Sequence, residues 1–292
     1  MQLNQKLWDG YEDFYLANEE LTHIIEEGYF GEKVVLLLQK VESYEDKHQL
    51  YEIIKDWIEG DEIKFFTKTY MLFMLKVILE SFETNPNQTY EEISTFITGS
   101  RKDPRKEKLS TILEFQLLST ETQKKVSTLN SKSSIGDIRN VTSSISNNYS
   151  KGIEFIGKII PLFICLVKIK NQEEYNMYKI EKLNLHKKLI EFDACTSYEY
   201  KIITNMINRD IRNAEAHLSL IYSDKRKKYV LRKIVNGKYQ NEYIKPIDLF
   251  LDLKLNIVSF INAFIYSTTL IVLGTLDKEL FIDLYKQICE LK

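Results

Sequence analysis

Apolar residues recur every three or four positions along most of the chain, which is the spacing of one face of an α-helix. The stretch 63–82 is apolar on nearly all sides, so it predicts a buried helix at the centre of an N-terminal core. Residues 1–58 predict amphipathic helices with acidic outer faces, and 109–129 predict another helix. Between them, Asn85-Pro86-Asn87 predicts a turn that is followed by a basic loop at 101–108.

The run 127–150 interrupts this pattern, because it is dense in serine, asparagine and threonine and holds apolar residues only at intervals. Such a composition is typical of a domain boundary or a flexible connection. We therefore expect three parts: an N-terminal helical region at 1–130, a Ser/Asn-rich connection at 131–150 and a C-terminal helical bundle at 151–292.

The C-terminal bundle divides into helices and one hairpin. The helices are expected at 155–167, 175–192, 197–222, 246–273 and 277–291. Pro161 predicts a kink in the first of them. Asn236-Gly237 lies between two β-tolerant runs, and Asn-Gly is a strong hairpin signal. The predicted fold class is all-α, with a small β-hairpin inserted after the 197–222 helix.

The helix expected at 197–222 has two contrasting faces. One is an apolar stripe at helical spacing: Ile203, Ile207, Ile211, Ala214, Leu218 and Ile221. At about 100° per residue, the residues turned away from this stripe are Arg209, Arg212, Asn213 and Ala216, and His217 lies nearer the edge of the stripe. Other surfaces of this chain mix lysine and glutamate, so guanidiniums, an amide and an imidazole around a small alanine indicate a candidate site.

An arginine, then a polar residue and, a few positions on, a histidine, all within one amphipathic helix, resembles the ribonuclease motif of HEPN domains. The matching residues here are Arg212, Asn213 and His217. Residues 151–292 also resemble these domains, which are up-and-down helical bundles, whereas 1–130 show no specific resemblance. The tetrapeptide Asp210-Ile211-Arg212-Asn213 also occurs at 137–140, but there no histidine follows, so we interpret the second copy as a coincidence.

RNA carries its own nucleophile, the 2′-hydroxyl, so a ribonuclease can work without a metal. It needs a base for that hydroxyl, an acid for the departing 5′-oxygen and positive charge on the phosphorane. His217 suits the acid or base role because imidazole titrates near neutral pH. Arg212 suits the phosphate because its planar fork donates two parallel hydrogen bonds. Asn213 could orient either group, and the implied products carry a 2′,3′-cyclic phosphate and a 5′-hydroxyl.

A single helix supplies one histidine, and Arg212 and His217 lie roughly 140° apart around its axis. HEPN nucleases commonly place two motif helices across a two-fold axis, and the small Ala216 would let a partner helix approach. We therefore expect a homodimer with a composite, isologous site. The alternatives are that Ala216 is small by chance and that Arg212 pairs with Glu215, three positions on.

The net charge is -2, so affinity for RNA must come from local patches. Arg209 and a basic run are the candidate RNA-binding residues; the run is Lys225, Arg226, Lys227 and Lys228. The interleaved Tyr229 would help by stacking on bases. The alternative for the run is a solvated hairpin edge, and for the basic loop at 101–108 it is a solvated connection. Gly-rich phosphate loops and Cys or His clusters with metal-ligand spacing are not found, so we expect no cofactor and no metal.

Composition and the N-terminal residues indicate the cellular compartment of the protein. A hydrophobic fraction of 44% and four prolines in 292 residues favour a packed helical protein. The three cysteines have no close spacing, and residues 1–6 lack a signal-peptide pattern, so we expect a cytoplasmic protein. The uncharged stretch 255–276 could span a bilayer. Polar residues spread along it favour a buried helix in a soluble core or subunit interface, and a membrane protein is the alternative.

The resemblance implies an RNA endonuclease acting as a toxin or abortive-infection effector, held inactive by an antitoxin or until an activating partner is present. Residues 1–130 would be a sensor, a regulatory region or an extension of the dimer surface. Some HEPN toxins are controlled through a tyrosine two residues after the motif histidine, where this chain has Ser219. The alternative is a catalytically silent HEPN-like module that binds RNA, nucleotide or protein; the intact Arg212, Asn213 and His217 argue against it.

Overall fold

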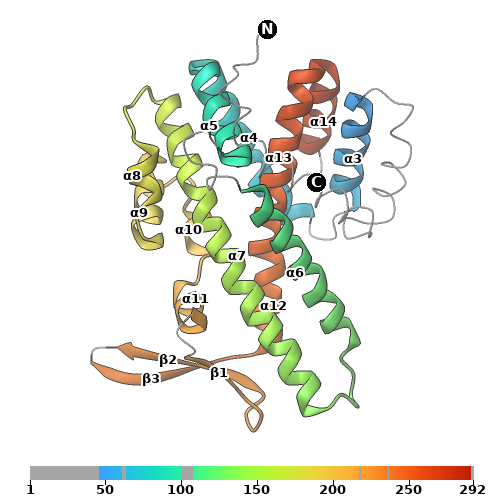
Figure 1. Ribbon diagram of the computed structural model, residues 1–292, viewed down its shortest axis with the longest axis vertical. Helices are drawn as coiled ribbons and strands as arrows, with labels where there is room; N and C mark the ends of the chain where they lie inside the picture. Colours follow the sequence, from blue (N-terminus) through green and yellow to red (C-terminus); the bar gives the residue numbers. More distant parts are fainter. Residues whose placement is uncertain (1–45, 61–63, 100–107, 217–218, 236, 291–292) are drawn as a thin grey trace.

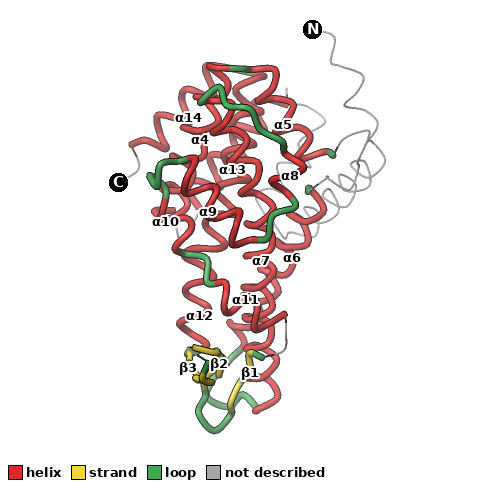
Figure 2. The backbone as a smooth tube through the Cα atoms, turned by 90° about the vertical axis from the view of Figure 1, so that its left-hand side faces the viewer, coloured by secondary structure: helices red, strands yellow, loops and turns green. Residues whose placement is uncertain are grey.

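The computed structural model describes residues 46–60, 64–99, 108–216, 219–235 and 237–290. These residues are mostly helical and include one small antiparallel sheet, so the predominantly all-α character is confirmed (Figure 1). The molecule has two parts. A helical body occupies most of its length, and a sheet end, made of helix α11 (Arg209–Ala216) and the three strands, lies at one end beside the tips of the long helices (Figure 2). The predicted helices within 1–45 and most of the basic loop at 101–108 lie outside the described residues.

Three long helices form the centre of the helical body. They are α4 (Lys64–Thr84), α7 (Ile135–Lys170) and α13 (Ser259–Leu276), and α4 packs against both of the others. Aromatic rings of the three helices meet at Phe163 of α7. Its ring centroid lies 5.2 Å from that of Phe73 in α4 and 6.3 Å from that of Phe264 in α13. The predicted burial of 63–82 is confirmed, and its partners come from the C-terminal half of the chain.

The remaining helices of the body cover this centre. They are α3 (Asp46–Gly60), α5 (Pro86–Thr98), α6 (Leu109–Thr128), α8 (Met177–Glu181), α9 (Leu185–Cys195), α10 (Lys201–Asn205) and α14 (Lys278–Glu290). Helices α3 and α14 lie against α13, and α6 and α9 lie against α7. The turn predicted at Asn85-Pro86 begins a helix, because the Asn85 side chain accepts a hydrogen bond from the Gln88 amide at 3.2 Å. The helix predicted at 175–192 is two helices, α8 and α9, each with its own asparagine cap.

The Ser/Asn-rich segment 131–150 is not a flexible connection. From Ile135 onward it belongs to α7, which continues through Pro161 to Lys170. A capping box starts the helix, because the Ser134 hydroxyl accepts from the Asp137 amide and the Asp137 carboxylate accepts from the Ser134 amide. Val141, Ile145, Tyr149 and Ile153 are buried on one face. Periodic burial therefore outweighs the polar composition on which the prediction relied.

The single helix predicted at 197–222 is also wrong. The chain forms α10, then α11 (Arg209–Ala216), and then strand β1 (Leu220–Ser223). The break has a local cause, because the Asn208 side chain accepts hydrogen bonds from the amides of Asp210 at 3.1 Å and Ile211 at 3.3 Å and so starts a new helix. The apolar stripe is buried at Ile203, Ile207, Ile211 and Ala214, but Ile221 is exposed.

The hairpin predicted at Asn236-Gly237 is confirmed as part of a larger sheet. Strands β2 (Lys228–Val235) and β3 (Lys238–Ile244) pair antiparallel, and Val235 pairs with Lys238 across a two-residue loop. Gly237 has φ 74°, the left-handed conformation that such a loop favours in glycine. Strand β1 adds to the other side of β2, so the sheet order is β1-β2-β3.

The predicted 246–273 helix is confirmed in outline. It runs as α12 (Pro246–Asp252), a π-helical turn (Leu253–Val258) and α13. The π-helical turn packs against α7 where Gly152 lacks a side chain, since a Cβ there would overlap Ile257. Residues 246–274 form a helix that is long and apolar enough to cross a membrane. Of its most apolar stretch, 56% is buried, and the core helix of a soluble protein can have the same length and composition.

Candidate functional site

Helix α11 carries Arg209, Arg212 and Asn213 at the junction between the helical body and the sheet. It packs against α7, β1 and β2 (Figure 1). Ile211 and Ala214 are its buried residues. The Tyr149 hydroxyl supports its start, because it lies against the Asn208 backbone and donates to the Asp252 carboxylate at 2.6 Å. Burial raises the pKa of Tyr149, so the phenol stays neutral. The opposite side of α11 is turned toward solvent, with Asn213 exposed.

Arg212 and Asn213 lie together at this solvent edge. The Arg212 Nη1 donates to Asn213 Oδ1 at 3.2 Å, and its Nη2 donates to Glu154 Oε1 of α7 at 3.4 Å. The Arg212 side chain is 34% exposed and that of Glu154 36%. The Nε of Arg212 is buried and has no hydrogen-bond acceptor among the described residues. Among the described side chains, the ion-pair partner of this arginine is Glu154, which lies 58 positions away in the sequence.

The Arg212–Glu154 ion pair is weak enough to be replaced. Pairs with this much solvent exposure contribute about 0–1 kcal/mol, because water and salt screen them and long side chains lose freedom. A phosphate offers the guanidinium two oxygens and a bidentate geometry, which a single 3.4 Å contact does not. The geometry therefore leaves the terminal nitrogens of Arg212 accessible to a phosphate.

The other candidate residues are only partly brought together. His217 lies outside the described residues, so the geometry of the Arg212–His217 pair is not given by the structure. Arg209 is exposed at the first position of α11, one turn before Arg212 and Asn213. Two of the three expected catalytic residues thus share one solvent-facing edge of one short helix.

An ion-pair cluster holds α11 on the sheet. Lys233 Nζ of β2 lies 2.7 Å from the Asp210 carboxylate and 2.6 Å from that of Glu242 on β3. Burial alone would lower the pKa of Lys233, but the hydrogen bonds to the two carboxylates outweigh burial, and the pKa is raised. Lys233 therefore stays charged and connects the candidate helix to two strands.

The basic run lies away from α11, at the turn between β1 and β2. Lys225, Arg226 and Lys227 are exposed in this turn and Lys228 begins β2. Arg139 anchors the turn to α7 through two hydrogen bonds of 3.0 Å from its Nε to the Asp224 carboxylate. Five residues of strand separate Lys228 from Lys233, roughly 17 Å. The run and Arg212 thus share the sheet end of the molecule and form separate clusters.

Tyr229 does not serve the role that the sequence suggested. Its ring is buried, and its hydroxyl donates to the carbonyl of Thr142 in α7. Side chains alternate between the two faces of a strand. In β2, Tyr229 and Leu231 lie on the face that packs against the helices. Stacking by Tyr229 on a base is therefore excluded in this conformation.

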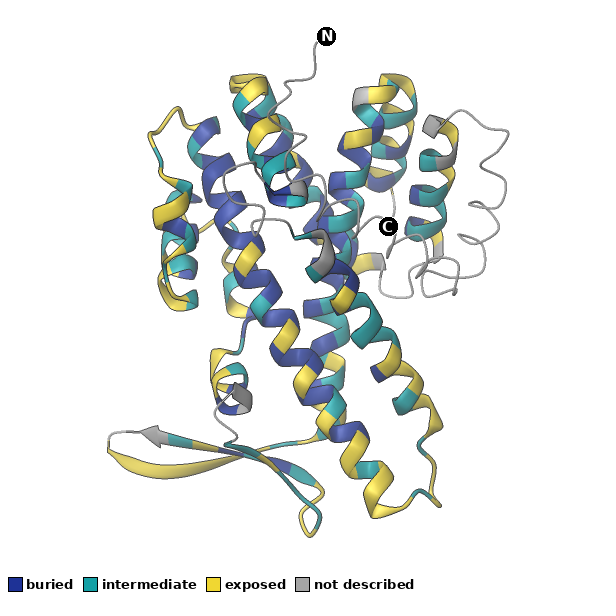
Figure 3. Ribbon diagram, in the orientation of Figure 1, coloured by how far each residue is buried: buried dark blue, intermediate teal, exposed yellow. Residues whose placement is uncertain are grey.

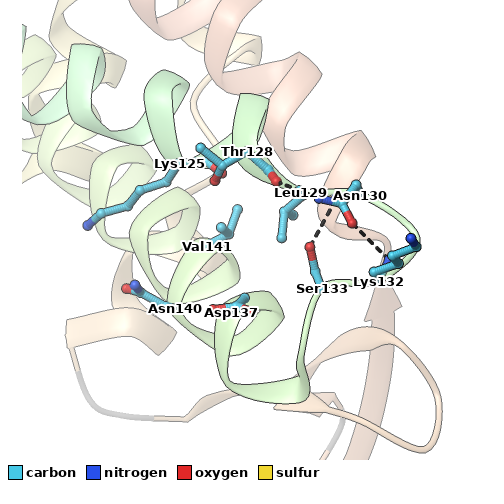
Figure 4. A pocket seen from close by; sticks show the side chains of 9 residues that line it. All are labelled: Lys125, Thr128, Leu129, Asn130, Lys132, Ser133, Asp137, Asn140 and Val141. Carbon is cyan, nitrogen blue, oxygen red and sulfur yellow. Dashed lines mark hydrogen bonds between the residues drawn. The ribbon is translucent and has the colours of Figure 1, made fainter.

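Two hollows open beside α7. One, of about 320 Å³, lies between α6 and α7 and is lined by Glu154 together with Lys151 and Lys158. The other, of about 460 Å³, lies at the α6–α7 turn, and its polar lining includes Lys125 and Asp137 (Figure 4). Glu154, which contacts Arg212, is one of the residues that line the first hollow, so this hollow with its two lysines adjoins the candidate site.

The chain matches no family model, no curated protein and no solved structure. The candidate site is therefore defined by its residues and their geometry. Glu154 escaped sequence reasoning because nothing in a linear pattern links it to Arg212. Two tyrosines of β3, Tyr239 and Tyr243, were also missed, although their spacing of four in a strand signals a shared face.

Proposed function

We propose that the protein is a metal-independent RNA endonuclease of HEPN type, with Arg212, Asn213 and His217 as its catalytic residues. The observation that carries the proposal is the pairing of Arg212 and Asn213 on the solvent edge of α11, with terminal guanidinium nitrogens accessible to a phosphate. A buried, fully paired arginine could not take part in such chemistry. The catalytic roles of the three residues are inferred from the resemblance to the HEPN motif.

The proposed reaction is a transesterification followed by product release. A general base takes the proton of the 2′-hydroxyl, the 2′-oxygen forms a bond to phosphorus, and the bond from phosphorus to the 5′-oxygen breaks. A general acid gives that 5′-oxygen a proton, which leaves a 2′,3′-cyclic phosphate and a 5′-hydroxyl. His217 serves as base or acid, and Arg212 stabilises the extra negative charge on the phosphorane. Asn213 holds the guanidinium through the Nη1 hydrogen bond.

A second copy of the chain would complete the acid–base pair. One chain supplies a single candidate histidine, and the Arg212 and Asn213 edge of its α11 helix is open to a partner. We therefore propose a homodimer in which two α11 helices face each other across a two-fold axis. Light scattering would give twice the mass of one chain. Excess His217→Ala protein, allowed to exchange subunits with the wild type, would lower the cleavage rate, because a mixed dimer carries only one of the two histidines. Activity restricted to a monomer would remove the composite site.

The test is RNA cleavage by purified protein in the presence of EDTA. Arg212→Ala and His217→Ala are expected to lower the cleavage rate by about 100-fold or more, because each removes charge stabilisation or proton transfer. The chain offers a matched control, because His186→Ala alters an exposed histidine of α9. Equal cleavage by all four proteins would remove the site assignment.

A second candidate is a catalytically silent HEPN-like module that binds RNA, nucleotide or protein. The observation in its favour is that Arg212 already has an anionic partner in Glu154. If the protein is such a module, neither the wild type nor any of the variants cleaves RNA, with or without EDTA, although the wild type still binds RNA.

We further propose, from the resemblance alone, that the protein acts in the cytoplasm as a toxin or abortive-infection effector controlled by an antitoxin or an activating partner. Its expression in bacteria would then arrest growth, and His217→Ala would relieve the arrest while His186→Ala would not. Equal growth of all three strains, at equal protein levels, would contradict a toxin that is active without its trigger.

A further inference from the structure

The sheet has one face that the helices do not cover. Along β2, Tyr229, Leu231 and Lys233 turn toward α7 and α11, so the alternate residues Lys228, Val230 and Arg232 turn away. The pairing register adds their neighbours on the adjacent strands: Ile221 and Ser223 of β1, and Tyr239, Asn241 and Tyr243 of β3. We call this set the solvent face of the sheet. Its strands lie at the extreme end of the molecule, and β3 is exposed along almost its whole length (Figure 3).

The two faces of the sheet differ in charge. On the helix side, Lys233 is neutralised by Asp210 and Glu242. The solvent face carries Lys228 and Arg232, and its described residues include no carboxylate. The adjoining β1–β2 turn brings Lys225, Arg226 and Lys227, while its one acid, Asp224, is paired with Arg139. In a chain with a formal net charge of -2, this is a local surplus of positive charge.

Aromatic rings stand among these cations. Tyr239 is 83% exposed, the most exposed large hydrophobic side chain of the described residues, and Tyr243 is 40% exposed. The Arg226 guanidinium lies over the Tyr243 ring, 4.7 Å from its centroid. Across the strands Tyr243 pairs with Val230, and Arg232 pairs with Asn241, which lies between the two tyrosines on β3. An apolar side chain, an amide and a cation therefore share this face with the rings.

We propose that the solvent face of the sheet is a binding platform for single-stranded RNA, at the same end of the molecule as the α11 site; this inference rests on the proposed nuclease function. Exposed rings stack on unpaired bases whatever their identity. Arginine and lysine beside the rings neutralise the phosphates that follow the bases. Solvent-exposed antiparallel sheets with aromatic side chains bind single-stranded RNA in this way.

An acidic protein partner or a second copy of β3 would be the other occupants of such a surface. The platform has little to offer an apolar interface, because cations surround its rings and Asn241 lies between Tyr239 and Tyr243 on the same face. Duplex RNA is disfavoured as well, because its bases are already stacked and its surface offers phosphates and riboses. The observations therefore favour an unpaired strand.

The test measures binding without cleavage. A fluorescein-labelled, fully 2′-O-methylated 12-nucleotide RNA has no free 2′-hydroxyl, so it reports binding even to an active nuclease. Tyr239→Ala should weaken its anisotropy-measured affinity about 5- to 100-fold, and Tyr239→Phe should keep it within about twofold, because the ring remains. Arg232→Ala should lower the salt dependence, log Kobs against log salt concentration, by about 0.7.

Tyr178→Ala is the matched control, because Tyr178 is 57% exposed on α8 and also carries a cation over its ring, Lys182 at 3.9 Å. That variant should bind as the wild type does. Unchanged affinity in Tyr239→Ala, or an equal loss in Tyr178→Ala, would overturn the platform. Tighter binding of duplex RNA or of single-stranded DNA of the same sequence would overturn the assignment to single-stranded RNA. Loss of a dimer in Tyr239→Ala with RNA affinity intact would identify a contact between copies instead.

The platform and the nuclease fail separately. If the wild type cuts no RNA but Tyr239→Ala still weakens binding of the methylated strand, the platform stands and the nuclease proposal falls. If the wild type cuts RNA, Tyr239→Ala should raise KM and leave kcat unchanged, because it removes binding made equally in ground and transition states. Cleavage with an unchanged KM in that variant would leave the nuclease and remove the platform.

Discussion

The helical body and the sheet end are held together in different ways. In the body, Phe163 meets rings from α4 and α13 and is completely buried, as are most apolar side chains of α7. At the sheet end, α11 is one short helix attached by Ile211, Ala214 and the ion pairs of Lys233. Stability therefore comes mainly from the body, and the residues with available chemistry gather at the end, where few contacts would be lost by changing them.

This division indicates which part of the molecule should carry function. Apolar burial stabilises by roughly 25 cal/mol per Å², so the body has little freedom to vary. Charged and aromatic groups left at the solvent, such as Arg212 and Tyr239, contribute little to stability. Substitutions in the two regions should separate folding from activity, with effects that decrease from the body to the candidate site.

The largest expected loss of stability comes from the centre of the body. Phe163→Ala removes a completely buried ring and leaves a cavity, which costs about 3–5 kcal/mol in the free energy of unfolding. Chemical denaturation monitored by circular dichroism measures it. Tyr198→Ala, at a tyrosine that is 59% exposed, should change stability by no more than about 0.5 kcal/mol. Similar costs at the two positions would contradict the proposed centre of the core.

The second prediction concerns the close approach of α7 and the π-helical turn. Gly152→Ala places a Cβ against Ile257 and the Phe115 ring, so neighbours must shift and stability should fall by about 1–3 kcal/mol. Gly136→Ala is the control on the same helix, since its Cβ would meet only the Ser134 hydroxyl at 3.5 Å. Better helix propensity should leave that variant as stable as the wild type or slightly more stable. A stabilised Gly152→Ala protein would show that the contact has room.

A smaller effect is expected where the sheet meets the body. Tyr229→Phe keeps the ring in place but removes the hydrogen bond to the Thr142 carbonyl, which should cost about 1 kcal/mol. Tyr222→Phe, on the neighbouring strand and in edge contact with the same ring, should cost less. Thermal unfolding of the two proteins separates the hydrogen bond from ring packing, and a reversed order would mean that the Tyr229 hydroxyl does not hold the sheet on α7.

The smallest expected effect touches the candidate site alone. Glu154→Gln removes the negative charge that faces Arg212, so RNA phosphate should compete more easily and KM should fall, by up to about fivefold. Stability and kcat should stay unchanged. Glu173→Gln, which alters a carboxylate paired with Lys168 in the body, is the control. A higher KM in Glu154→Gln would indicate that the carboxylate positions Arg212 for phosphate rather than competing with it.

Sequence patterns predicted the elements whose signals are local. The apolar stretch 63–82 and the Asn236-Gly237 turn are both signals within one continuous segment, and both predictions are confirmed. The 131–150 prediction was wrong because composition was given more weight than the buried period through Ile145 and Tyr149. The break at Asn208 was hidden because the apolar stripe continues in phase across it.

The candidate site was harder to predict for a physical reason. Arg212 and Asn213 are neighbours in the sequence, so their shared face follows from helix geometry alone. Glu154 comes from another helix, and the sheet that carries Lys233 depends on pairing that includes β1, three of whose four residues were assigned to a helix. Tertiary contacts of this kind have no signature in a single linear pattern.

The most direct test of the catalytic claim uses a DNA oligonucleotide that contains one ribonucleotide. The account predicts a single cut, immediately 3′ of that ribose, in the presence of EDTA. The cut leaves a 2′,3′-cyclic phosphate and a 5′-hydroxyl, and it is lost in both His217→Ala and Arg212→Ala. Cutting that persists when the single ribose is 2′-O-methylated, or that proceeds at the wild-type rate without His217, would contradict it.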